Sequence, residues 1–96
     1  MIVNIEAMMN VGRAIGQNNF KMILPEGSKL SDLLKSIKLQ EKGNAYELMV
    51  GEDGHLDSHY TVLLNEEQVD DRTLDREIKD HDLLIMMDTV HTGTII

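Results

Sequence analysis

The sequence predicts an α+β domain in which a sheet of four or five strands is covered on one face by one main helix. Three observations lead to this prediction. The 96 residues can form one hydrophobic core but not two domains. Short runs rich in strand-forming residues are separated by turn residues. One stretch alone has a strong helical period, and its single apolar stripe can cover only one face of a sheet.

Two strands are expected before the helix. Residues 2–9 alternate weakly between apolar and polar side chains, and residues 20–24 form a second run of strand-forming residues. Two glycines punctuate residues 10–18, so we expect a loop or a short helical turn there. Pro25 stops the second strand because proline lacks the N–H that a strand donates.

The helix is expected over residues 29–41, where apolar residues recur at intervals of three and four. Ser28 is placed to cap its N-terminus, and Asp32 lies in the first turn, where the helix dipole favours a negative charge. Gly43 can end the helix in a left-handed conformation. The apolar stripe consists of Leu30, Leu33, Leu34 and Ile37.

Three further strands are expected after the helix, over residues 46–50, 60–65 and 83–87. The Asp-Gly pair within residues 51–54 indicates a hairpin turn after the first of these strands. The connecting residues 66–82 are mostly polar. Their apolar anchors are Val69, Leu74 and Ile78.

The net charge of -8 is unevenly distributed along the chain. Residues 1–51 have a balance of +1, whereas residues 52–96 contain twelve acidic and three basic residues. The acidic half is either a solvated face that keeps the protein soluble or a patch that steers a basic partner. Acidity argues against binding nucleic acid, whose phosphates would repel it. The chain has no cysteine, no membrane-length apolar run and no signal peptide, so we expect it in the cytoplasm, not in a membrane.

Four segments, taken together in their order and spacing, resemble the MoaD/ThiS family of ubiquitin-like sulfur carriers. The resemblance implies a β-grasp fold with a mixed sheet for residues 1–88 and a flexible C-terminal tail for residues 89–96. The segments are Pro25-Glu26-Gly27-Ser28 with residues 31–34; Asp53-Gly54 with residues 62–65; residues 78–85; and residues 87–93.

The sequence departs from the family pattern in three places. His81 replaces the usual turn glycine, where a left-handed conformation is less comfortable for histidine. Asp88-Thr89 replaces a pair of prolines, so we expect a less rigid entry to the tail. The terminal Gly-Gly of the family is represented only by Thr92-Gly93, and residues 94–96 follow it.

The resemblance also implies a chemistry that is located on the tail. An ATP-using, E1-like activating enzyme adenylates the C-terminal glycine carboxylate, and a sulfur donor converts it to a thiocarboxylate. The sulfur then passes to a pterin or thiazole precursor in a partner such as the large subunit of molybdopterin synthase. The carrier is not itself an enzyme and needs no cofactor.

Two readings of the tail stay open. In the first, a protease removes residues 94–96 and exposes Gly93 as the carrier terminus of a molybdopterin, tungstopterin or thiamine pathway. In the second, the carrier chemistry has been lost, and the domain is a noncatalytic binding or accessory subunit. Under either reading, the Thr92 side chain would crowd a channel that is fitted to glycine.

Two methionine pairs are candidate partner contacts. Met8-Met9 ends the first expected strand and Met86-Met87 ends the last, and alternation should turn one member of each pair inward and one outward. The outward members would form an adaptable apolar patch.

Two histidines are weak candidates for metal ligands. His55 and His59 lie four residues apart in an extended segment that also contains aspartates, although polar residues are common beside a turn. We expect no metal site.

Overall fold

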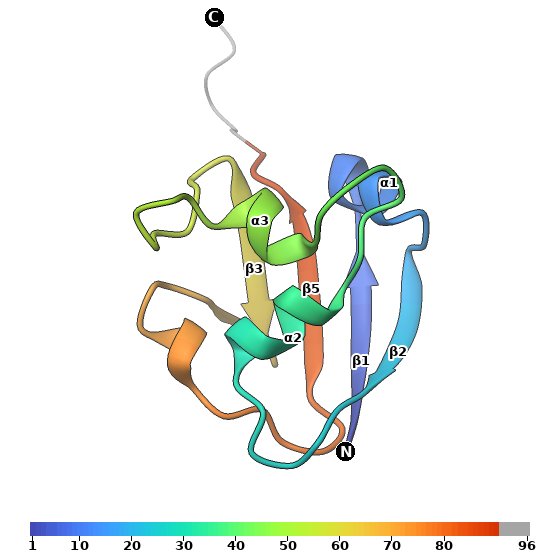
Figure 1. Ribbon diagram of the computed structural model, residues 1–96, viewed down its shortest axis with the longest axis vertical. Coiled ribbons are helices and arrows are strands. Elements are labelled where there is room, and N and C mark those ends of the chain that lie inside the picture. Colours follow the sequence, from blue (N-terminus) through green and yellow to red (C-terminus); the bar gives the residue numbers. More distant parts are fainter. Residues whose placement is uncertain (91–96) are drawn as a thin grey trace, which may run out of the picture.

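The computed structural model describes residues 1–90, which form a mixed five-stranded sheet in the order β2-β1-β5-β3-β4 (Figure 1). β1 and β5 are parallel neighbours at the centre of the sheet, and the other pairs are antiparallel. In chain order the strands are β1 (Ile2–Ala7), β2 (Asn19–Ile23), β3 (Tyr60–Leu64), β4 (Glu67–Gln68) and β5 (Leu83–Asp88).

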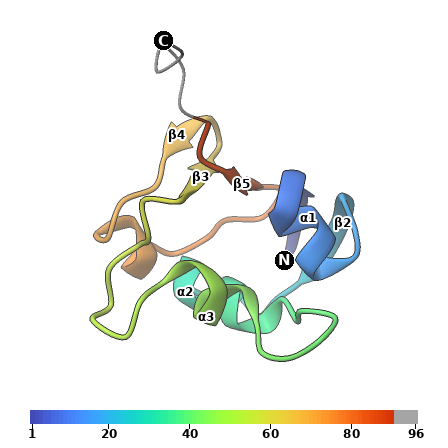
Figure 2. The same ribbon diagram turned by 90° about the horizontal axis from the view of Figure 1, so that it is seen from above.

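The helices lie mainly on one side of this sheet. Seen from above, α2 and α3 cover one face, and α1 lies beside the end of β1 (Figure 2). The predicted α+β class is therefore confirmed, with two further short helices beside the one that was expected. The helices are α1 (Met9–Ile15), α2 (Leu30–Ser36), α3 (Ala45–Met49) and the 3-10 turn η1 (Thr73–Asp75).

The core lies between the sheet and α2, and it contains the side chains that the sequence pattern predicted to be buried. The four residues of the helical stripe are buried, as are the three predicted anchors between β3 and β5. Each of these side chains adds to the hydrophobic stabilisation, because burying a large aliphatic side chain is worth about 1.5–3 kcal/mol. From the sheet they meet Val3, Ile5, Ala7, Val62, Leu84 and Met86.

The strand predicted over residues 46–50 is wrong, because this segment is helix α3. The side chain of Asn44 caps the helix by accepting a hydrogen bond from the Glu47 N–H, at 2.9 Å. The buried residues Ala45 and Met49 are one helical turn apart. The turn after α3 is present, with a bond from Gly54 N–H to Gly51 O, but it joins only the isolated antiparallel bridge between Val50 and Leu56 and not two strands. The fifth strand is β4, within the mostly polar residues 66–82, where no strand was predicted.

The main helix is shorter than predicted. α2 ends at Ser36, and Ile37 already has an extended backbone with ψ of 109°. Ser28 is not the cap, because its hydroxyl donates to Pro25 O. The N-cap is Lys29, whose N–H donates to Asp32 at 2.9 Å, so the predicted first-turn aspartate has its expected place. Gly43 is left-handed, with φ of 86°, but it belongs to the following loop.

Two tight turns have non-glycine residues in the left-handed region. Asn65 has φ of 50° and turns the chain from β3 into β4, while its side-chain amide bonds the Leu83 N–H at 2.9 Å and Asp82 at 2.8 Å. His81, which replaces the glycine of the family pattern, has φ of 68° before β5. Asparagine tolerates this region better than histidine does.

Candidate functional site: the root of the C-terminal tail and the uncovered sheet face

The face of the sheet opposite α2 and α3 carries an apolar patch on β3 and β5. We call Leu63, Leu83, Ile85 and Met87 the outer sheet patch, because they alternate with the buried residues of the same strands and are half-buried. Leu63 lies opposite Ile85 in the register of the two strands. Both helices that cover the sheet lie on its other face (Figure 2). The patch is therefore open to a partner.

The methionine pair on β5 alternates as predicted. Met86 is fully buried in the core, and Met87 belongs to the outer sheet patch. A partner can reach Met87 without disturbing the core, whereas Met86 contributes only to the packing beneath it.

The prediction for Met8 and Met9 is wrong in its geometry. β1 ends at Ala7, so neither methionine alternates across the sheet, and both are exposed, at 40% and 49%. Helix α1 can lie this close to the end of β1 because Gly12 has no side chain. A Cβ on Gly12 would lie 2.6 Å from Ala7 O, so any other residue would push the helix away from β1. Met9 enters the helix with a positive φ of 57°.

Asp88 anchors the root of the tail on the α1 side. Its carboxylate accepts a hydrogen bond from Asn10 Nδ2 at 2.7 Å and one from the Val11 N–H at 3.2 Å. Because β5 ends at Asp88, these two bonds fix the end of the last strand against the start of α1.

Thr89 anchors the root on the other side. Its N–H donates to His59 O at 2.8 Å, its hydroxyl donates to Ser58 O at 2.9 Å, and that hydroxyl lies 2.9 Å from Thr61 Oγ1. Hydrogen bonds thus hold these two residues where the family has prolines, and the expectation of a less rigid entry stays a prediction. Thr92 and Gly93, the predicted carrier residues, lie outside the described residues.

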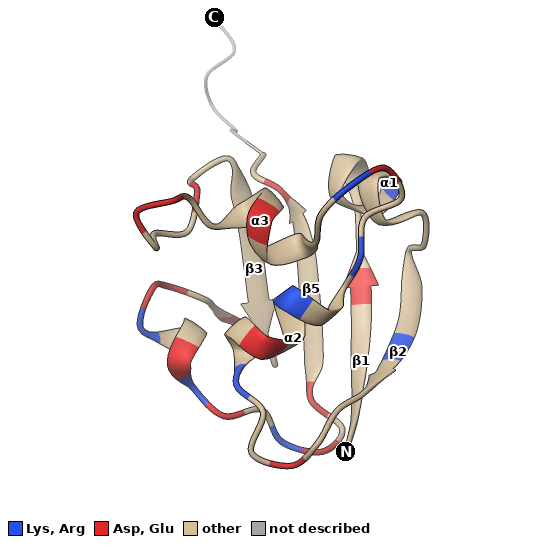
Figure 3. Ribbon diagram, viewed as in Figure 1, with Lys and Arg blue, Asp and Glu red and all other residues tan. Residues whose placement is uncertain are grey.

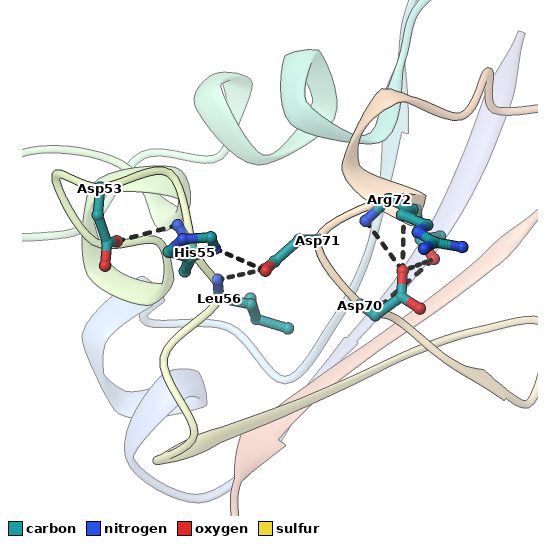
Figure 4. A network of polar contacts seen from close by, with 7 residues as sticks. Asp53, His55, Leu56, Asp70, Asp71 and Arg72 are labelled. Carbon is teal, nitrogen blue, oxygen red and sulfur yellow. Dashed lines mark hydrogen bonds and ion pairs between the residues drawn. The ribbon is translucent and has the colours of Figure 1, made fainter.

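The loop that precedes β3 is tied to the loop that follows β4 (Figure 4). Asp71 accepts from the Leu56 N–H at 2.8 Å and lies 2.7 Å from His55 Nδ1. The hydrogen bond of the imidazole to the Asp71 carboxylate raises the pKa of His55, and the nearby Asp53 adds to this effect. The bond from the Leu56 N–H, together with His55, lowers the pKa of Asp71. This cross-link joins two segments that are far apart in the sequence.

His59 has a different carboxylate partner. Its Nδ1 lies 2.7 Å from Asp57, which also accepts the His59 N–H and therefore has a lowered pKa. No group of three or more side chains suited to hold a metal ion occurs within residues 1–90. Each histidine therefore pairs with its own aspartate, His55 with Asp71 and His59 with Asp57.

Many acidic residues of the second half bind backbone N–H groups. Of the twelve acids after residue 51, seven aspartates accept at least one such bond, a structural role that the charge count alone did not suggest. These aspartates are Asp53, Asp57, Asp70, Asp71, Asp80, Asp82 and Asp88.

No protein family model matches this sequence, and no curated protein matches it significantly. Solved structures do match. SAMP1 from Haloferax volcanii has a TM-score of 0.70 at 18% identity, over 97% of this chain and 100% of that chain. A putative molybdopterin converting factor, subunit 1, from Pyrococcus furiosus has a TM-score of 0.69 at 22% identity, over 94% and 99%. A chain of the BexX/CysO complex from Amycolatopsis orientalis has a TM-score of 0.66 at 18% identity, over 95% and 99%.

These matches define the class of the fold as ubiquitin-like β-grasp, as predicted. They cover nearly all of both chains, so the resemblance to the MoaD/ThiS sulfur carriers is confirmed at the level of the fold. In residues 1–90, each helix falls short of the length and apolar content that crossing a bilayer requires.

Proposed function

We propose that this chain is a ubiquitin-like sulfur carrier that works through Gly93 on a partner enzyme. The observation that carries the proposal is the full-length match to small β-grasp proteins, one of them named as a molybdopterin converting factor subunit. That name favours a pterin precursor over a thiazole precursor as the sulfur acceptor. The described residues would bind the partner and hold the root of the tail, and the activating enzyme would supply the catalysis.

The partner surface that we propose combines the outer sheet patch with the two exposed methionines of α1. The Met8 N–H donates to Met86 O at 2.9 Å, so Met8 and Met9 lie near the C-terminal end of β5, which leads into the tail. Methionine side chains adapt to different apolar surfaces, which suits a carrier that visits both an activating enzyme and a sulfur acceptor enzyme. The complex named among the matches supports this kind of pairing.

The proposed tail chemistry has three steps: hydrolysis, adenylation and sulfur transfer. Hydrolysis of the peptide bond after Gly93 frees its carboxylate, which attacks the α-phosphorus of ATP and releases pyrophosphate. Hydrosulfide then attacks the acyl-adenylate and displaces AMP, so a sulfur atom replaces one carboxylate oxygen. Glycine suits this position because a tail without side chains can thread a narrow channel.

Intact-mass spectrometry tests the carrier proposal directly. The full chain and a variant that ends at Gly93 are each incubated with the E1-like activating enzyme of the same organism, ATP and sulfide. We expect the Gly93-ending chain to gain the mass difference between sulfur and oxygen. A control variant that ends at Thr92 should gain no mass, because its terminal carboxylate lies one residue earlier and belongs to a β-branched threonine. Unchanged mass of the Gly93-ending chain would reject the carrier chemistry.

The second candidate is a noncatalytic binding subunit, which Thr92 favours because it stands where the family has glycine. Partner binding separates this candidate from loss of all function. Met9→Lys and Met87→Lys should weaken binding to the molybdopterin-synthase-type large subunit while the fold stays intact, because both side chains are accessible. Strong binding without any sulfur transfer would support the accessory role, and unaffected binding in both variants would reject the proposed surface.

A further inference from the structure

Strand β2 forms an edge of the sheet and pairs on one side only. β1 is its single neighbour within residues 1–90. Two backbone bonds mark the register, from the Leu24 N–H to Met1 O at 3.0 Å and from the Ala7 N–H to Asn18 O at 2.8 Å. In an antiparallel pair, residues that bond across the pair alternate with residues whose backbone groups point away.

This alternation leaves the backbone groups of Asn19, Lys21 and Ile23 directed away from β1. Phe20 and Met22 lie between them and bond β1 opposite Ile5 and Val3. The outer side of β2 therefore offers a row of N–H and C=O groups that an additional strand can bind.

A groove runs beside this edge. It lies between β2 and the chain that follows α2, and its floor is formed by Phe20, Met22 and Ile37. Lys21 and Lys38 line it as well. Ile23, at the end of the same strand, is 82% exposed. An added strand would place every second side chain toward the apolar floor.

The charge around the groove is opposite to that of the molecule as a whole. Residues 9–23 and 35–43 contain five basic residues and one acidic residue, whereas the net charge of the chain is -8. Figure 3 shows these bases on β2, on α1, at the end of α2 and on the segment that follows α2. A partner that uses this edge should therefore carry negative charge.

A lysine on an edge strand can also serve only to prevent aggregation. Protection alone does not account for the apolar groove alongside or for an isoleucine that is almost fully exposed. These two features add contact surface to the edge, which a purely protective arrangement does not need.

We propose that the β2 edge binds an extended segment of another protein as an additional strand. The segment has an apolar core of alternating residues and acidic residues at its flanks. The core side chains contact Phe20 and Met22 in the groove, and the acidic flanks meet Lys21 and Lys38. This surface is separate from the root of the tail, so the inference does not depend on the carrier chemistry.

NMR of the full chain tests this proposal with a synthetic peptide. The probe is an end-blocked peptide of about ten residues, with alternating valine and threonine flanked by glutamates. We expect saturable shift changes at residues 19–23 and at Lys38. Amide exchange of Lys21 and Ile23 should slow by about tenfold or more, because their N–H groups gain partners. Exchange of Phe20 and Met22 should change less, because β1 already binds them.

Two pairs of variants keep the test specific. Ile23→Pro removes an outward N–H and should weaken binding by about tenfold, whereas Ile23→Thr keeps this donor and should bind nearly as well. The double variant Lys21→Glu with Lys38→Glu reverses the charge at the groove without altering the backbone. Its affinity for the peptide should also fall by about tenfold. Lys79→Glu, outside the groove, is the matched control.

Several results would overturn the proposal. A peptide with lysine flanks that binds as tightly would remove the charge argument. Shift changes confined to residues 52–90, which include the outer sheet patch, would show that the peptide binds away from the β2 edge. Shifts at residues 19–23 that depend on protein concentration without peptide would show that a second copy is the occupant. Absence of saturable binding by the glutamate-flanked peptide would also reject the proposal.

Discussion

The two edges of the sheet are finished in different ways. β2 pairs with β1 over five residues and leaves its outer side open, with Lys21 near its middle. β4 has only two residues, and the chain beyond it folds back toward the core through Val69 and Leu74. One edge is left accessible and basic, and the other is closed by packing.

The difference gives the acidic half of the chain a physical explanation. Around the closed edge, backbone N–H groups cannot all join a strand ladder, and aspartates bind them instead. Asp70 accepts from the Arg72 and Thr73 N–H groups, and Asp71 accepts from the Leu56 N–H. A large part of the negative charge therefore stabilises turns, which neither of the two sequence-based explanations had considered. A charge count alone is a weak argument for a partner surface there.

The largest expected effect compares a core anchor of the closed edge with a side chain of the open edge. Leu74→Ala should reduce the free energy of unfolding by about 2–4 kcal/mol, because Leu74 is buried. Phe20→Ala should cost about 1–2 kcal/mol, because Phe20 is only half-buried and part of its surface is already hydrated. Urea denaturation measures both. Equal losses would contradict the view that the closed edge depends more on packing.

The next effect concerns the turn that leads into the closed edge. Asn65→Ala should cost about 1–2 kcal/mol, because it removes the bonds to Asp82 and to the Leu83 N–H and forces alanine into the left-handed region. Asn65→Gly should cost about 1 kcal/mol less, since glycine adopts this conformation freely. Thermal unfolding of both variants separates the two causes. Identical melting temperatures would show that backbone strain has no part.

A smaller effect of opposite sign is expected at the turn before β5. His81→Gly should stabilise the protein by up to about 1 kcal/mol, because glycine relieves the positive φ of 68°. The His81 N–H bond to Ile2 O is a backbone bond and persists in the variant. His81→Ala is the control and should not stabilise, because alanine keeps the strain. A lower melting temperature for His81→Gly would contradict this interpretation.

The smallest effect is the pH dependence of the His55–Asp71 cross-link. Because the pKa of His55 is raised in the folded state, His55 contributes fully to the free energy of unfolding below its ordinary pKa of 6.5. This contribution is lost as the pH rises through the folded-state pKa. The lowered pKa of Asp71 means that its contribution is present above the ordinary value of 3.8 and is lost as the pH falls through the folded-state value. The cross-link should therefore stabilise most between about pH 4 and 6.5.

Denaturation across pH in the wild type and in Asp71→Asn tests this window. The stability difference between them should be largest between the ordinary pKa values of the two groups, 3.8 and 6.5, and should shrink as the pH rises through the raised pKa of His55. Asp57→Asn is the matched control, because Asp57 pairs with His59 within the same loop and joins no distant segment. A difference that stays constant with pH would exclude the His55–Asp71 pair as its source.

Periodicity was sufficient to predict the parts of the fold that depend on burial. The stripe of α2, the three anchors and the run of β3 follow from apolar spacing, and all are where they were expected. It failed at residues 46–50, because a short, mostly apolar segment fits both a strand and a helix, and Asn44 as a cap decides for the helix. The end of the helix at Ser36 was missed because Lys38, Lys42 and Gly43, which are typical of a helix C-terminus, lie beyond it.

The site was harder to predict than the fold. Met87 follows from strand alternation, but the exposure of Met8 and Met9 depends on the close approach of Gly12 to Ala7 O, which no local pattern reveals. The contacts of Asp88 and Thr89 join residues far apart in the sequence, so a motif comparison shows only that two prolines are missing. The open β2 edge likewise follows from strand order, not from the composition of β2.

The parallel pairing of β1 with β5 also determines when this protein can fold during synthesis. Within residues 1–90, the central pair of the sheet joins the first strand to the last. A ribosome-bound chain must therefore wait for β5 to emerge before its core can close, and such non-local pairing is slow. The strand that completes the fold is also the strand that leads into the tail. Asp88 and Thr89 gain their hydrogen bonds only after this closure, so only a folded molecule presents the root of the tail in this position to another protein.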